Sequence, residues 1–195
     1  MIDFTNKPLD EQYAAFVRSK FLAMPIAGTI AWTAIGVAGA VLPPGLAVWA
    51  LFIGTGGTYG LGVFVSRFTG EDLVGRKSKG NRFDKIFLHT VFMAVLVYAI
   101  AIPFFMVQPT SLPMSVGILA GLMWIPFSAL IDHWVGLFHG ISRTALLVFA
   151  HYAFPAQRFV LIPALVVLVY LITIAVLYNR YRAVSSIPVG AGGVL

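Results

Sequence analysis

The sequence contains no cysteine and very little charge. Without cysteine, disulfides, thiolate metal sites and cysteine nucleophiles are excluded. Charged residues make up 10% of the 195 residues, against about 25% in soluble domains, and 59% are hydrophobic. The mean hydropathy is +0.92. A soluble fold could not bury so much apolar surface, so the composition predicts a single membrane domain with no room for a separate soluble catalytic domain.

Long apolar runs indicate the membrane spans. A transmembrane helix needs about 20 mostly apolar residues. Six stretches meet this requirement, and they cover residues 21–42, 45–64, 86–107, 112–131, 134–154 and 159–178. Short links containing proline or polar residues separate most of them. The sequence therefore predicts an all-α polytopic membrane protein, a bundle of about six transmembrane helices.

The basic residues indicate the orientation, because short cytoplasmic loops carry an excess of Lys and Arg. Of the 13 Lys and Arg residues, all but two fall in segments on one side of the six-span arrangement. These are Lys7, Arg18, Lys20, Arg67, Arg76, Lys77, Lys79, Arg82, Lys85, Arg180 and Arg182. Only Arg158 falls on the other side, and Arg143 lies within a span. This predicts cytoplasmic termini, a plasma (inner) membrane and a basic cytoplasmic loop over residues 65–85.

The basic character also bears on partners. The net charge of +6 could suggest nucleic acid in a soluble protein. Here the lipid bilayer explains it better, and we expect no nucleic-acid partner. In residues 1–20, Leu9, Tyr13, Phe16 and Val17 recur at helical spacing. This pattern is typical of a short amphipathic helix lying on the inner membrane surface.

The candidate substrate site lies in and just before the fifth span. It consists of Asp132, His139, Ser142 and Arg143. Ionisable groups inside a span are costly, so they usually mark a function or a specific partner. His139 and Arg143 are four residues apart and share one helix face. The alternative is that Arg143 lies nearer the inner surface, where it reaches water or pairs with Asp132.

Histidines raise the possibility of haem b, which can take one imidazole from each of two helices. His89 begins the third span and could face His133 or His139. No spacing rule supports this pairing, so we expect no cofactor, with haem b as the alternative. We expect no metal site either, because Asp132 is the only carboxylate near these histidines.

The second span carries a run of small residues, with a possible secondary site at Gly56, Gly57 and Thr58. GxxxG pairs occur at Gly56 and Gly60, at Gly117 and Gly121, and at Gly136 and Gly140. Such pairs let helix backbones approach closely, within the chain, in a homo-oligomer or against a membrane-protein partner. Alternatively, the Gly-Thr run is partly unwound and exposes carbonyl groups to a solute.

Proline and aromatic residues complete the pattern. Pro103, Pro126 and Pro163 predict kinks in three spans. Trp32, Trp124 and Tyr170 are interpreted as packing residues rather than the lining of a cavity.

These features favour a small transporter or channel for an anionic or proton-coupled solute. A haem or redox protein is one alternative, and a non-catalytic subunit or assembly factor of a membrane complex is another. An enzyme is not favoured, because no arrangement of Ser, His and acid suited to hydrolysis is visible.

Overall fold

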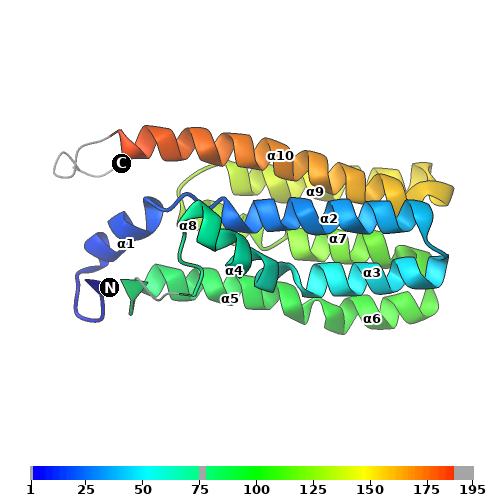
Figure 1. Ribbon diagram of the computed structural model, residues 1–195, viewed down its shortest axis with the longest axis horizontal. Coiled ribbons are helices and arrows are strands. Elements are labelled where there is room, and N and C mark those ends of the chain that lie inside the picture. Colours follow the sequence, from blue (N-terminus) through cyan, green and yellow to red (C-terminus); the bar gives the residue numbers. More distant parts are fainter. Residues whose placement is uncertain (1, 75–77, 187–195) are drawn as a thin grey trace.

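The computed structural model describes residues 2–74 and 78–186. Arg76 and Lys77 of the predicted basic loop lie outside the described residues. The described part is an elongated bundle of helices that run along one axis (Figure 1). A parallel pairing of two two-residue strands, β1 (Ile2–Asp3) and β2 (Ser78–Lys79), supplements the helices. The protein is therefore all-α in architecture, as predicted.

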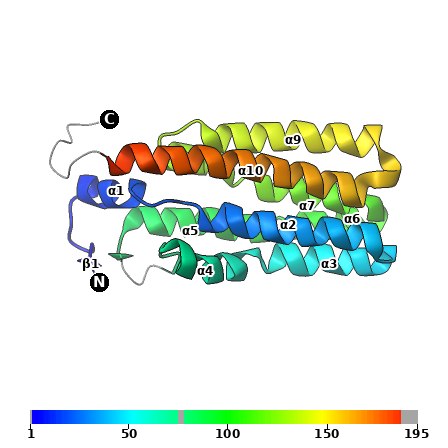
Figure 2. The same ribbon diagram turned by 45° about the horizontal axis from the view of Figure 1, so that its top comes forward.

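Three helices run unbroken along the bundle. They are α2 (Ala23–Val41), α9 (Val135–Ala153) and α10 (Arg158–Ser185). Helix α10 packs extensively on both α2 and α9, and these three lie side by side in two views (Figures 1 and 2). Helix α10 continues through Pro163, so the predicted kink does not break it.

The other long elements are interrupted pairs. They are α3 (Pro44–Gly56) with α4 (Thr58–Thr69), α5 (Arg82–Leu96) with α6 (Tyr98–Val107), and α7 (Leu112–Gly121) with α8 (Trp124–Leu130). Proline explains the last break, because the ring of Pro126 conflicts with the carbonyl of Leu122 four residues earlier. Pro103 lies inside α6, beyond the break at Val97. Single 3₁₀ turns, η1 (Pro109–Ser111) and η2 (Pro155–Gln157), precede α7 and α10.

A helix or an interrupted pair occupies each of the six predicted segments. Four of these units are long and apolar enough to cross a membrane, and a fifth is added if α3 and α4, bent by 52°, form one span. Helix α9 has 19 residues but is not among them, because its histidines and Arg143 make it less apolar. Side chains such as Ile53, Phe68 and Val107 face outward, which suits a lipid environment.

Both described chain ends lie at one end of the bundle, called here the terminal end (Figure 1). The same end holds α1 (Leu9–Val17), the described residues 70–74 and 78–81 of the link before α5, and the turn over 131–134. The predicted loop over 65–85 is shorter than expected, since α4 extends to Thr69 and α5 starts at Arg82. The opposite end, called the far end, holds the turns before α3, α7 and α10.

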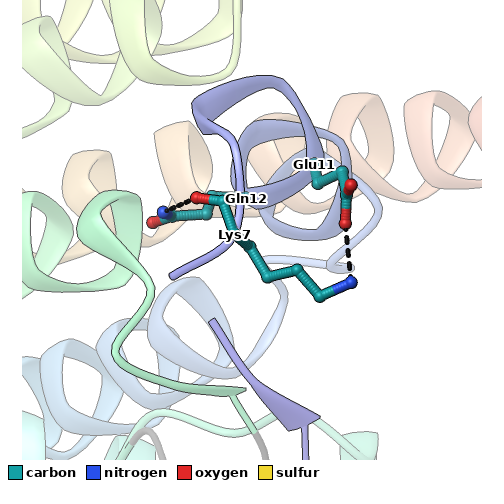
Figure 3. A network of polar contacts seen from close by, with 3 residues as sticks. All are labelled: Lys7, Glu11 and Gln12. Carbon is teal, nitrogen blue, oxygen red and sulfur yellow. Dashed lines mark hydrogen bonds and ion pairs between the residues drawn. The ribbon is translucent and has the colours of Figure 1, made fainter. Parts of the chain in front are cut away.

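Helix α1 is fastened to the start of α5. The Nε2 of Gln12 donates to the Lys7 carbonyl at 2.8 Å, and Lys7 pairs with Glu11 at 2.9 Å (Figure 3). The Oε1 of Gln12 accepts from the backbone N–H of Arg82 at 2.8 Å, while Asn81 donates to the Gln12 carbonyl. The N-terminal helix therefore docks against the chain as well as facing outward.

Candidate functional site

Arg143 and His139 lie on the inward face of α9. Neither side chain has any solvent exposure, with 0% for both. Their spacing of four residues places them on one face, and the same face carries the buried Val135, Gly136 and Leu147. The pattern therefore directs the most polar pair of α9 into the bundle, away from the outer surface.

Hydrogen bonds connect this pair to α10. Thr173 Oγ1 donates to the Val169 carbonyl at 2.8 Å, so it accepts from His139 Nδ1, also at 2.8 Å. His139 Nε2 is then the acceptor for Arg143 Nη1, at 3.4 Å. The chain of donors requires a neutral imidazole that carries its proton on Nδ1.

Aromatic rings surround both side chains. The Arg143 Cζ lies 5.3 Å from the ring centroids of Trp32 and of Tyr170. Trp124 stacks on His139 at 4.4 Å with an angle of 22° between the planes, and Tyr170 lies 4.8 Å from the imidazole. These rings attract the guanidinium, but the Tyr170 hydroxyl forms no hydrogen bond with Arg143 Nε or Nη2. They form an enclosure around the pair.

Part of the guanidinium has no partner. Within residues 2–74 and 78–186, no acceptor is within hydrogen-bond reach of Arg143 Nε or Nη2. An unsatisfied buried polar group costs about 1–3 kcal/mol, and more when it is charged. Such a cost inside a packed bundle is the clearest sign that Arg143 serves something besides folding.

Glycines let α7 and α8 approach α9 closely. A Cβ on Gly121 would lie 2.9 Å from Arg143 Cδ, and one on Gly136 would lie 2.1 Å from the Trp124 carbonyl oxygen. A Cβ on Gly117 would meet Leu147 at 2.5 Å, and one on Gly140 would meet Ile125 at 2.9 Å. Two of the three GxxxG pairs thus bring helices together around Arg143.

The other two predicted substrate residues lie apart from this enclosure. Asp132 is exposed in the turn before α9, with a φ of 46°, and it forms no salt bridge with Arg143. Ser142 is half-buried and donates to the Phe138 carbonyl at 2.6 Å. The pairing of Asp132 with Arg143, considered as an alternative, is therefore absent from the structure.

The histidines considered for haem are not brought together as a pair of free ligands. His89 is exposed on α5. His133 accepts the N–H of Val135 at 3.2 Å, and burial lowers its pKa, as does the nearby Arg180, while Asp132 acts in the opposite direction. Both ring nitrogens of His139 are already hydrogen-bonded. A haem iron at His139 would therefore have to displace one of these two hydrogen bonds.

The secondary site at Gly56, Gly57 and Thr58 coincides with the break between α3 and α4. Thr58 donates back to the Gly54 carbonyl at 2.8 Å, and next to the break Thr55 is hydrogen-bonded to Tyr98 at the break between α5 and α6. A Cβ on Gly56 or Gly60 would meet nothing within 4 Å. This GxxxG pair therefore does not serve close packing within the described chain, unlike the other two.

Glu71 lies at the terminal end, between two hollows. One is a cleft of about 200 Å³ that also contacts Ser66, Arg67 and Asp72. The other is a void of about 10 Å³, room for about one water, bounded by apolar side chains that include Trp124. Because Trp124 stacks on His139, this series of contacts leads from the terminal end toward Arg143.

The carboxylate of Glu71 also caps α2. It accepts the backbone N–H groups of Leu22 and Ala23, both at 2.9 Å. Burial raises its pKa, against the opposing effects of these N–H groups, Thr69 and Lys20. The cap holds the start of α2 at the edge of both hollows.

Sequence reasoning did not find Thr173 or Glu71 as parts of these arrangements. Thr173 follows Tyr170 by three residues in an otherwise apolar run, which places both on one helix face. That spacing was the available signal. For Glu71, an acid in a basic link, no local pattern indicates a cap for a helix that begins 48 residues earlier.

No curated protein and no solved structure matches the chain significantly. One family model matches residues 13–180, which include every residue described above as surrounding Arg143. The chain belongs to that family, which is described as a family of unknown function, DUF7010.

Proposed function

We propose that this protein is a small membrane transporter or channel that binds an anionic or proton-coupled solute at Arg143 and His139. The observation that carries the proposal is the fully buried guanidinium with unpartnered donors. A bundle that needed only packing would not keep such a group, because an apolar side chain of similar length would fill the space at lower cost. A solute that accepts hydrogen bonds would remove the penalty while bound.

His139 suits a proton-coupled cycle. An imidazole can take up a proton on its acceptor nitrogen, which in His139 is Nε2 and points at the guanidinium. Protonation at Nε2 would break the bond from Arg143 and place a second positive charge beside it. Binding of an anion would offset that charge, so proton and anion would favour each other's binding.

The topology we propose has six spans with both termini in the cytoplasm, in a plasma membrane. Helix α9 is the fifth span in chain order and the one that its lower apolar content does not identify as a span, and its His139 and Arg143 side chains point into the bundle rather than toward lipid. The basic residues support the orientation, because they gather on elements of the terminal end. Those in the described residues are Lys7, Arg18, Lys20, Arg67, Lys79, Arg82, Lys85, Arg180 and Arg182, while Arg158 is at the far end.

The interrupted helices and the hollows beside Glu71 support the proposal that the protein changes conformation during transport. Broken helices at a buried site are typical of transporters, whose halves bend about such points. The α7–α8 break directly follows Gly121, whose Cα carries no side chain against Arg143. Movement there would open the enclosure on the side of Trp124, which borders the small void beside Glu71.

Proteoliposomes test the proposal. Vesicles containing the purified protein, valinomycin and an entrapped pH dye receive an inward gradient of potassium nitrate or potassium chloride. Swelling measures anion entry, and the dye measures proton movement. We expect entry above that of empty vesicles for at least one salt, and at least a tenfold loss with Arg143→Met. Entry that is equal in wild-type, Arg143→Met and protein-free vesicles would overturn the proposal for these anions.

One observation favours a second candidate, a subunit of a membrane complex. Gly56 and Gly60 are exposed on either side of the α3–α4 break, although the two matching pairs elsewhere are filled by neighbouring helices. A helix of another chain could pack against this exposed bend. Gly60→Leu would then abolish co-purification with a partner at fixed ratio while leaving the monomer intact. A protein that purifies alone, with and without this change, would argue against the second candidate.

A further inference from the structure

The two unpartnered nitrogens of Arg143 form one edge of its guanidinium. By convention Nη1 lies on the same side as Cδ, so Nε and Nη2 carry parallel N–H bonds on the opposite side. The Nη1 group is engaged with His139, and the ring centroids of Trp32 and Tyr170 lie 5.3 Å from Cζ. What remains is a complete two-donor edge rather than a single stray atom.

We infer that the Nε–Nη2 edge of Arg143 is a recognition site for a small oxyanion bound through two of its oxygens. This inference rests on the proposed function and names the class of its solute. Two parallel N–H donors match two oxygens on one carbon or nitrogen centre, as in a carboxylate or nitrate, and such bidentate bonds are the strongest that arginine forms. A halide offers one centre and cannot satisfy both donors equally well.

The surroundings favour an anion that brings its own charge. Arg143 makes no salt bridge in the described part of the chain, and the neutral His139 contributes no negative charge. Aromatic faces compensate the guanidinium only in part, and they exclude water that would compete for its donors. The two parallel donors therefore select an anion with two oxygens on one centre, and the positive charge of the guanidinium favours an anion over a neutral solute.

Gly121 controls the space beside this edge. A Cβ at this position would lie 2.9 Å from Arg143 Cδ and 3.1 Å from Nε. A methyl group there would crowd the Nε–H, and because its contact with Cδ is shorter than 3.0 Å the Arg143 side chain would have to shift. On the same helix, a Cβ on Gly117 would meet Leu147 Cδ1 at 2.5 Å and no atom of Arg143. The two glycines thus provide a test position and a matched control.

The test measures binding without transport. Purified protein in lipid nanodiscs is melted in sodium formate, sodium nitrate or sodium chloride at equal ionic strength, and affinity is obtained from the shift with concentration. We expect formate and nitrate to raise the melting temperature at concentrations at least tenfold lower than chloride. Arg143→Lys should abolish this preference, since lysine keeps the charge but lacks the planar edge.

Gly121→Ala keeps the inference testable if Arg143→Lys does not fold. It should weaken formate and nitrate binding at least tenfold, while Gly117→Ala should retain the wild-type preference. Equal shifts in all three salts, or a preference that persists in Gly121→Ala and Arg143→Lys, would overturn the inference.

The two proposals fail in different ways. Oxyanion binding that requires Arg143, with no flux in proteoliposomes, would leave the recognition site standing and remove the transport role. Flux that requires Arg143 but is equal for nitrate and chloride, with no preference in the melting assay, would keep the transport role and remove the oxyanion recognition site.

Discussion

Arg143 Nη1 meets His139 Nε2 at 3.4 Å, one turn apart on α9, and both side chains are completely buried. The imidazole acts as an acceptor for the guanidinium only because Thr173 on α10 accepts its other N–H. Two helices therefore fix the protonation pattern of the pair.

Thr173→Val should destabilise the protein by about 1–3 kcal/mol, because it leaves the buried N–H of His139 without an acceptor. Thr33→Val is the matched control, since Thr33 is exposed and also bonds to its own helix, through the Thr29 carbonyl. Thermal melting of the two variants in the same nanodiscs measures the difference. A Thr173→Val variant as stable as Thr33→Val would contradict the hydrogen-bond chain.

Arg143→Met should melt at or above the wild-type temperature while it loses solute binding. The change removes a buried charge with two unpartnered donors and keeps an apolar chain of similar length. Stability and binding would then move in opposite directions, as at sites kept for function. A strongly destabilised Arg143→Met protein would instead indicate a structural role for the guanidinium.

Gly136→Ala should disrupt the fold, whereas Gly60→Ala should be tolerated. The added methyl at position 136 would lie 2.1 Å from a backbone oxygen, which cannot move aside as a side chain can. At position 60 it meets nothing within 4 Å, and alanine gains about 1 kcal/mol of helix propensity over glycine. Expression level and melting temperature report both effects. Equal behaviour of the two variants would argue against the packing of α8 on α9.

Glu71 should make stability depend on pH. Because burial raises its pKa above the ordinary 4.5, the folded state holds the proton more tightly than the unfolded state. The stabilising contribution of the protonated form is complete below about pH 4.5 and is lost as pH rises through the raised pKa.

The wild-type protein should therefore lose stability relative to Glu71→Gln as the pH is raised from 4 toward neutrality. Melting curves across this range measure the difference, and Asp10→Asn, which also removes one acid, is the control. A constant difference between wild type and Glu71→Gln at every pH would exclude the predicted titration.

Reporter fusions test the proposed topology. Fusions after Lys79 and at the C-terminus should report the cytoplasm, and a fusion after Gln108 should report the opposite side. These positions lie on links, so the fusions need not interrupt a helix. Agreement between Gln108 and Lys79 would mean that α5 and α6 do not cross the membrane together.

Much of the fold follows from local pattern, but the enclosure around Arg143 does not. Apolar runs place the helices within a few residues, and the spacing of His139 and Arg143 predicts their shared face. The partners of that face come from α2, α7, α8 and α10, and no rule of sequence spacing says which of these helices lie against it. The role of each GxxxG pair was equally undecided, because a small-residue face does not say which helix, if any, lies against it.

The capping of α2 by Glu71 has a consequence for biogenesis. The acceptor for the N–H groups of Leu22 and Ala23 is synthesised 48 or more residues after them, and the partner of Gln12 at Arg82 comes 70 residues later. During translation, α2 must therefore form before Glu71 is available to cap its N-terminal end. It acquires its native start only when the chain has turned back through α4, so the first hairpin matures as a unit with the link that follows it.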